Sequence, residues 1–330
     1  HDAGSKEIPP QKEPKEGKEG KKSAAKKENK DVEFLVGVEV ESGATGKGAK
    51  DTIKKVVSLL TTAVDSSVTD VFVAACDASC RVCKDAKGFQ TFFKAGGVET
   101  LMLALKDNTF GKDKSASKAL KEAIKESCKA TTAWFSEMDY VDFKEMGNFT
   151  YLSCWLCGQD ENLSLEVLEL IDRSGRMRIE NCAALIQGGA FAVLHKIISA
   201  HRAPELVEEA LGVMYHLCDL PPEASEEYMV PYLQHEQGLV STVVESLNSA
   251  PLNLRLQLTG LRLLAIWARH PSHEVRALLR KAEPAPALDG TVEKLSKGGF
   301  PHTAAWVSAI AARPLATALA PEEQQRAKLS

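Results

Sequence analysis

The sequence lacks any uninterrupted apolar stretch of the roughly 18 to 20 residues that a membrane-spanning helix needs. Charged residues recur throughout its longer apolar segments. It also lacks a strong net charge, because 41 Lys and Arg residues stand against 45 Asp and Glu residues, giving −4. No global basic field would therefore attract nucleic acid. These absences predict a chain with no membrane span, for which nucleic acid is not an expected partner.

The loop-rich cysteine pattern of a small disulfide-bonded secreted protein is also missing. The eight cysteines lie mostly within helical, apolar patterns: Cys76, Cys80, Cys83, Cys128, Cys154, Cys157, Cys182 and Cys218. This usage predicts a reducing compartment, with the cytoplasm favoured. The chain opens with His1 and not with Met, so an organelle reached after removal of a targeting peptide is the alternative.

The first part of the chain divides into two segments by composition. Residues 1–31 are rich in Lys and Glu and contain no large apolar residue after Ile8, which predicts a disordered tail. Residues 32–48 are predicted to be an extended arm followed by a Gly-rich turn. Apolar residues occupy every second position from Val32 to Val40, as in a half-buried strand. With no partner strand in the sequence, the arm would pack on a helical body or join a sheet of another protein.

From residue 49 onward the chain repeats a helical unit. Four segments align on a glycine, and each has a large apolar residue five positions later; a fifth copy is weaker. The aligned glycines recur every 42 to 52 residues: Gly97, Gly147, Gly189, Gly238 and, in the weaker copy, Gly290. Each short helix is followed by a turn and a longer helix. Repetition of this unit at 40 to 50 residues is the signature of an α-solenoid.

The "GGV", "GNF", "GGA" and "QGL" turns, each followed by an aliphatic helix and a long third helix, resemble armadillo repeats and shade into the HEAT class. The resemblance covers residues 49–312 and leaves 313–330 as a flexible C-terminal tail. It implies an all-α, right-handed armadillo/HEAT-like solenoid of about five to six repeats, whose third helices line a concave groove. The Trp-x-x-x-Asn pattern of importin-α-like members is absent, because Met138 follows Trp134 and Pro271 follows Trp267 at that spacing.

The stretch "ESGATGKGAKDTIKKVV", residues 41–57, has the setting of a phosphate-binding loop. The spacing from Gly43 to Gly48 fits that motif, but Ala49 and Lys50 occupy the positions that require Lys and then Ser or Thr. Gly48 also precedes Gly97 by the length of one repeat. We therefore interpret the loop as the turn before the first repeat's helix, and a nucleotide-binding enzyme is a disfavoured alternative.

Two Cys-x-x-Cys pairs raise the alternative of a zinc site. They are Cys80 with Cys83 and Cys154 with Cys157, and 71 positions separate the two pairs. Zinc ribbons keep their pairs about 15 to 20 residues apart, on knuckle turns. Because buried free cysteines behave as small hydrophobic residues, packing in the core is the favoured interpretation. A metal or redox role is the alternative, and no cofactor is expected.

The candidate partner-binding residues lie on the predicted helix 252–269. Arg255, Arg262 and Arg269 are spaced by seven, which places them on one stripe about 20 Å long, beside Thr259. A stripe that faced the groove would suit an acidic peptide, because guanidinium groups bind carboxylates bidentately.

An intramolecular role for the same arginines is the alternative. The preceding long helix carries Glu205, Glu208 and Glu209, and third helices are neighbours in a solenoid. His216 on that helix is a further candidate for the groove, although a hydrogen-bonded core or groove histidine is favoured over a catalytic base.

These features predict a non-catalytic protein–protein interaction scaffold or adaptor that uses the groove and the N-terminal extension. Its partners would be other proteins, such as an acidic peptide. One alternative is a structural subunit of a large multiprotein assembly, organellar or cytoskeletal, in which the extensions become ordered on binding. A nucleotide- or zinc-binding enzyme is the second and least favoured alternative.

Overall fold

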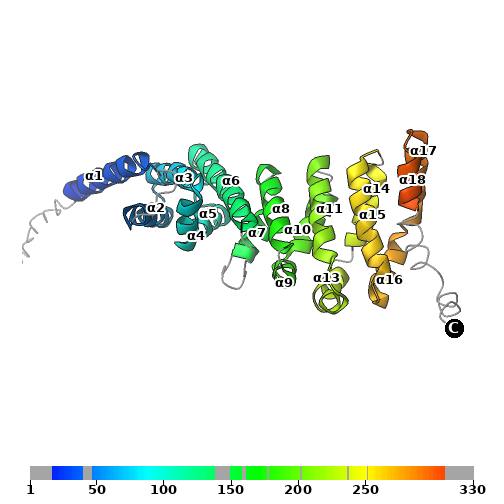
Figure 1. Ribbon diagram of the computed structural model, residues 1–330. Helices are drawn as coiled ribbons and strands as arrows, with labels where there is room; N and C mark the ends of the chain where they lie inside the picture. Colours follow the sequence, from blue (N-terminus) through cyan, green and yellow to red (C-terminus); the bar gives the residue numbers. More distant parts are fainter. Residues whose placement is uncertain are drawn as a thin grey trace, which may run out of the picture.

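The computed structural model describes residues 17–39, 47–137, 149–157, 161–176, 178–200, 203–235, 238–250 and 252–308. All regular structure in these ranges is helical. Successive helices stack into an elongated body (Figure 1). Each group of helices contacts mainly the groups before and after it, as in other solenoids.

One row of neighbouring helices runs along the body, and we call it the third-helix row. Its members are α3 (Thr69–Cys83), α6 (Lys114–Ser136), α8 (Glu161–Gly175), α11 (Pro204–Cys218) and α15 (Leu254–Arg269). Each contacts the next, and the last four stand side by side in Figure 1.

The remaining helices form the other layers of the stack. The second helices are α2 (Lys47–Ser66), α5 (Gly97–Lys106), α7 (Phe149–Cys157), α10 (Ala190–Ser199), α14 (Leu239–Ser249) and α17 (Ala285–Lys297). The first helices are α4 (Ala86–Lys94), α9 (Ile179–Gln187), α13 (Val230–His235) and α16 (His273–Ala282). A short helix α12 (Pro222–Ala224) and a π-helical turn (Ser225–Met229) precede α13. After α17 comes α18 (Pro301–Val307). This arrangement confirms the predicted all-α, armadillo/HEAT-like fold.

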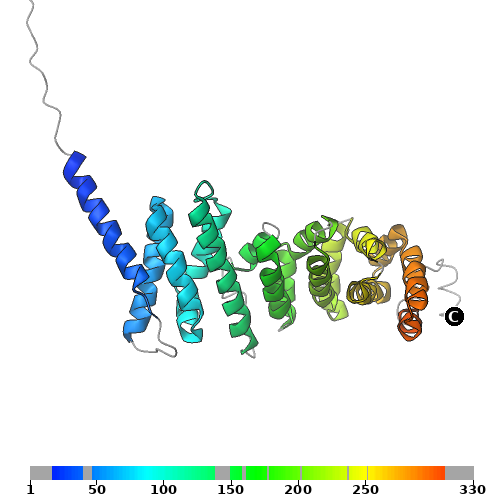
Figure 2. The same cartoon turned by 90° about the horizontal axis from the view of Figure 1, so that it is seen from above.

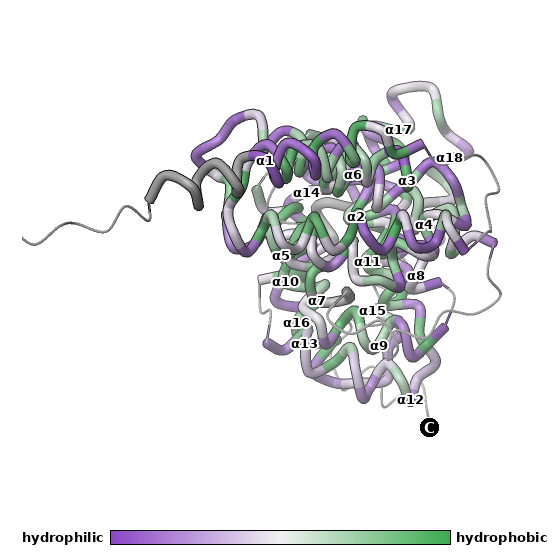
Figure 3. Tube along the Cα trace, turned by 90° about the vertical axis from the view of Figure 1, so that its left-hand side faces the viewer, coloured by the Kyte–Doolittle hydropathy of each residue, from purple (hydrophilic) through white to green (hydrophobic). Residues whose placement is uncertain are grey.

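Each helix buries one stripe of its surface against its neighbours. On α15, Leu256, Leu263 and Trp267 are buried while Arg255 and Arg262 are exposed, as expected of an amphipathic helix. Figure 3 shows hydrophobic and hydrophilic residues along the same helices. The stacked stripes join into one continuous apolar core.

No single helix within the described ranges is both long and apolar enough to span a membrane. Only α9 and α10 taken together reach that length and composition, and they are bent by 67° at the turn between them.

Paired glycines shape the turns before α5 and α10. Gly96 and Gly189 have φ angles of 85° and 94°, in the left-handed region that glycine adopts at little cost. The repeat pattern of the sequence aligns Gly97 with Gly189, but in the structure the equivalent of Gly189 is Gly96, one residue earlier. Gly97 has a different role, because a Cβ there would lie 2.4 Å from the ring of Phe92.

The other aligned glycines differ from this pattern. Gly238 precedes α14 with an ordinary φ of −84°, and Gly147 lies outside the described residues. Gly290 does not precede a helix at all, because α17 begins at Ala285 and continues past it. The prediction that Gly290 heads a repeat is therefore wrong. Prolines in the first turn start this helix instead.

The N-terminal predictions need correction. Helix α1 spans Gly17–Val36, so residues 17–31 are helical where a disordered tail was predicted, and 32–36 are helical where a strand was predicted. Lys, Glu and Ala, which fill this segment, are good helix formers. Residues 1–16, 40–46 and the C-terminal tail 313–330 lie outside the described residues.

Docking against α3 explains why the end of α1 is helical. Leu35 and Val38 are buried, and Arg81 donates hydrogen bonds from Nε to the Val38 carbonyl (3.0 Å) and from Nη2 to the Leu35 carbonyl (2.6 Å). The last carbonyls of a helix lack partners within it; Arg81 supplies one for Val38 and adds a second bond to the Leu35 carbonyl, which also accepts from the Val38 amide (3.3 Å). Helix α1 thereby continues the third-helix row at its N-terminal end (Figure 2).

A candidate binding surface on the third-helix row

The arginine stripe lies on the outer face of α15. Arg255, Arg262 and Arg269 are exposed, and Thr259 is half-buried between the first two. The helix begins where the Asn253 side chain accepts a hydrogen bond from the Leu256 amide (3.1 Å). Because seven residues make nearly two full turns, the three guanidinium groups share one side of the helix.

Arg255 is held by the preceding helix. Its Nε lies 2.8 Å from Glu208 Oε1 and its Nη2 lies 3.6 Å from Glu209 Oε2. Asn253 also donates to Glu208 Oε2 (3.4 Å). This is the intramolecular pairing with α11 that formed the alternative interpretation. Because Arg255 is 75% exposed, the pair adds little stability but fixes where this guanidinium lies.

Unlike Arg255, Arg262 and Arg269 are available to bind a partner. Neither forms an ion pair with any residue that the structure describes. The Arg262 guanidinium lies 5.6 Å from the ring centroid of Trp306 on α18, within the range of a cation–π contact. Trp306 is 37% exposed, whereas Trp267 is fully buried.

Trp306 is a surface residue that the sequence did not mark as a candidate for partner binding. The helix that carries Trp306 is short, and too few positions follow its apolar period to show which side is buried.

His216 belongs to a different contact from the arginine stripe. Its Nδ1 lies 2.5 Å from Asp172 Oδ1 on α8, and Arg176 Nη2 lies 2.7 Å from Asp172 Oδ2. Burial by itself would raise the pKa of Asp172, but hydrogen bonds from His216 and Arg176 lower it below its ordinary value. His216 therefore connects α11 to α8.

The charge of the row changes along its length. Exposed carboxylates on α8 and α11 include Glu169 and Glu205, whereas the exposed charges on α15 are arginines. Leu165, which is 44% exposed on α8, adds an apolar position to the acidic part. The row thus offers an acidic centre and a basic, partly aromatic C-terminal end.

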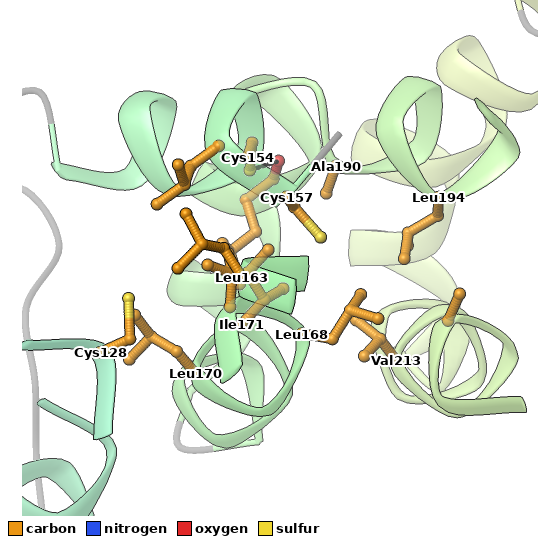
Figure 4. Packing of buried hydrophobic residues seen from close by; sticks show 14 of the residues in the cluster. Cys128, Cys154, Cys157, Leu163, Leu168, Leu170, Ile171, Ala190, Leu194 and Val213 are labelled. Atoms are coloured by element: carbon orange, nitrogen blue, oxygen red, sulfur yellow. Dashed lines mark hydrogen bonds between the residues drawn. The ribbon is translucent and has the colours of Figure 1, made fainter. Parts of the chain in front are cut away.

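The cysteines pack in the core, as predicted. All eight are free thiols, and all but the half-buried Cys80 are buried; Figure 4 shows Cys128, Cys154 and Cys157 among leucines. Burial raises the pKa of Cys80 to about 11 and that of Cys154 to about 12, which keeps both thiols protonated near neutrality. Within the described ranges, no group of three potential ligands could hold a metal ion.

Comparison with known proteins identifies the fold. No protein-family model and no curated sequence matches the chain. A designed armadillo repeat protein in complex with the peptide (KR)4 superimposes with a TM-score of 0.51 at 16% identity, covering 80% of this chain and 99% of that one.

A computationally designed armadillo repeat protein for modular peptide recognition gives a TM-score of 0.53 at 15% identity, over 76% of this chain and 98% of that one. An engineered protein gives 0.52 at 19% identity, over 81% and 97%. The chain therefore has the armadillo-repeat fold.

Proposed function

We propose that this protein is a non-catalytic scaffold or adaptor that binds protein partners along the third-helix row. The observation that carries the proposal is the continuous row from α3 to α15, whose outer face presents charged side chains over a shared apolar core. Extended surfaces of this kind are the usual means of recognition in solenoids. The designed armadillo proteins of the same fold, one bound to a peptide and one made for peptide recognition, support this function.

The C-terminal end of the row is the part best suited to an acidic segment. Arg262 and Arg269 present exposed guanidinium groups that form no ion pair with a described residue, and that of Arg262 lies beside Trp306. Arginine and tryptophan are enriched among the residues that dominate protein interfaces, and guanidinium groups bind carboxylates bidentately. We infer that the preferred partner presents acidic side chains and an apolar or aromatic anchor, a chemistry opposite to that of a Lys–Arg peptide.

The test is isolation of the full-length protein from cells with mass spectrometry, followed by binding measurements on acidic segments of the captured proteins. Reversing two charges in Arg262→Glu/Arg269→Glu is expected to weaken binding by about a hundredfold, because each lost charged hydrogen bond costs tenfold or more. The matched control is Lys281→Glu/Lys294→Glu, which makes the same charge change at exposed positions off the row. Equal loss in both variants would exclude the arginine site.

The projecting helix α1 favours a second candidate function, that of a structural subunit in a large assembly. Val36 at its end is 66% exposed, and its N-terminal half extends away from the stack (Figure 2). The size of the isolated complex distinguishes the two functions. A stable complex far larger than 35.8 kDa would indicate an assembly subunit, and a free monomer would indicate a transient adaptor.

A further inference from the structure

A second surface lies between α2 and α4, on helices that do not belong to the third-helix row. The two helices contact each other and leave a depression of about 460 Å³. Its lining is Lys50, Ile53, Lys54, Lys87, Gln90, Thr91, Lys94 and Ala95.

Four lysines surround this depression. Lys50 and Lys54 are one helical turn apart on α2, and Lys87 and Lys94 are two turns apart on α4. All four are exposed, and none of the lining residues is acidic. None of the four ammonium groups forms an ion pair with another residue in the described ranges. Four positive charges around one depression give it a local positive field, which attracts anions.

Another lysine-rich depression of the molecule shows the contrast. It occupies about 480 Å³ beside α6 and is also lined by four lysines. There, however, Glu122 lies among the lysines, and Lys125 forms an ion pair with Glu166 at 3.2 Å. Two carboxylates accompany the four lysines in that place, whereas no residue that lines the depression between α2 and α4 is acidic.

We propose that the depression between α2 and α4 binds clustered phosphate groups, as carried by a free polyphosphate or by a multiply phosphorylated lipid headgroup. A lysine ammonium group is a compact point charge and a common partner of phosphate, whereas arginine suits planar carboxylates. The Gln90 side chain adds a neutral amide donor, and buried Ile53 gives the site an apolar floor. Its volume matches that of small-molecule sites.

The charge of the whole chain indicates a compact ligand and not a nucleic acid. Net charge is −4, and the four lysines converge on a depression instead of following an extended stripe. Nucleic-acid binding usually requires a longer basic track. This site is separate from the arginine stripe. If the site does not bind phosphate, the proposed function as a protein-binding scaffold is unaffected.

The first arm of the test titrates inorganic tripolyphosphate into the full-length protein by calorimetry at low salt. Wild type is expected to bind one equivalent. Lys54→Gln/Lys94→Gln is expected to raise Kd at least about tenfold, because each lost charged hydrogen bond costs that much. Lys114→Gln/Lys118→Gln removes the same charge from the depression beside α6 and is expected to change Kd by less than about twofold. Circular dichroism checks that both variants are folded.

The second arm measures co-sedimentation with phosphatidylcholine vesicles that contain phosphatidylinositol bisphosphate. If Lys54→Gln/Lys94→Gln loses binding to tripolyphosphate, the ligand of the site is a free polyphosphate. If the same variant loses binding to the vesicles, the ligand is a lipid headgroup. Either result supports the site. Failure of both probes to bind, or equal weakening in both lysine pairs, would overturn it.

Discussion

At the scale of single residues, the two glycines before α5 have different tasks, and only the first of these tasks recurs before α10. Gly96 adopts the left-handed conformation, and Gly97 allows the ring of Phe92 to lie against the backbone. Before α10, Gly189 supplies the left-handed conformation and Ala190 follows it. A β-carbon is therefore excluded at Gly97 by packing and disfavoured at Gly189 by backbone strain.

Two alanine substitutions separate backbone strain from helix propensity. Gly189→Ala is expected to lower the free energy of unfolding by about 1 to 2 kcal/mol, because φ is 94°. Gly212→Ala is expected to raise it by about 0.5 to 1 kcal/mol, because Gly212 lies inside α11 with nothing within 4 Å of an added Cβ. Urea unfolding measures both. If Gly189→Ala left the free energy of unfolding unchanged, the turn would not require a positive φ.

Between elements, polar joints connect neighbouring members of the third-helix row. Asp172 on α8 binds His216 on α11, and Glu208 on α11 binds Arg255 on α15. The acidic side chains are similarly buried, with Asp172 16% and Glu208 14% exposed, but their partners differ, because His216 is 27% exposed and Arg255 is 75% exposed. The Asp172 joint should therefore contribute more to stability.

Acid pH should weaken the Asp172 joint. The pKa of Asp172 is lowered in the folded chain, so its contribution is present above its unfolded pKa, near 4, and is lost as pH falls through the folded pKa. Asp172→Asn is expected to cost about 1 to 3 kcal/mol of unfolding free energy at pH 7, and the difference from wild type should shrink below pH 4.

Denaturant unfolding at pH 7 and pH 3 tests this dependence. Glu180→Gln is the control, because Glu180 is 62% exposed in its contact with Arg178, and a change below about 0.5 kcal/mol is expected. A difference for Asp172→Asn that stayed constant with pH would mean that the joint does not depend on the charge of Asp172.

The observed helices also show which parts of the fold could be predicted from the sequence alone. The glycine spacing predicted the stacked helices, and the apolar period predicted burial of the cysteines. The strand prediction failed because Phe34, Leu35 and Val36 are consecutive and apolar, so the segment satisfies a helical period as well as a period of two. Contact with α3 and the bonds from Arg81 stabilise the helix, and neither is visible in a local pattern.

The candidate sites depended even more on tertiary structure. The spacing of the arginines placed them on one side of a helix, but only the structure shows Arg255 paired and Arg262 beside Trp306. The two pairs of lysines between α2 and α4 are more than 30 positions apart in the sequence. Their convergence results from helix packing, which no spacing rule could reveal.

Over the whole molecule, contacts connect each layer mainly with its immediate neighbours. The stability of such a chain is close to a sum of local terms and nearest-neighbour terms. A defect in the middle of the stack should therefore loosen nearby helices more than distant ones.

Leu168→Ala tests this expectation. Leu168 is fully buried on α8 (Figure 4), and its loss is expected to cost about 2 to 5 kcal/mol. Hydrogen exchange should increase most in α8 and its neighbours α6, α7 and α11, and least in α1 to α3. Leu165→Ala, on the same helix but 44% exposed, should change little. A uniform increase along the chain would instead indicate one globally cooperative unit.

The position of α1 sets the distance between the solenoid and whatever adjoins Gly17. The side chains from Lys26 to Lys30 are exposed, and burial against the body begins at Asp31. The helix from Gly17 to Lys30 is about 20 Å long at 1.5 Å per residue. Because Arg81 holds the other end of α1 against α3, the direction of this segment is set by that contact. A protein bound at Gly17 would therefore lie about 20 Å from the solenoid, along the axis of α1.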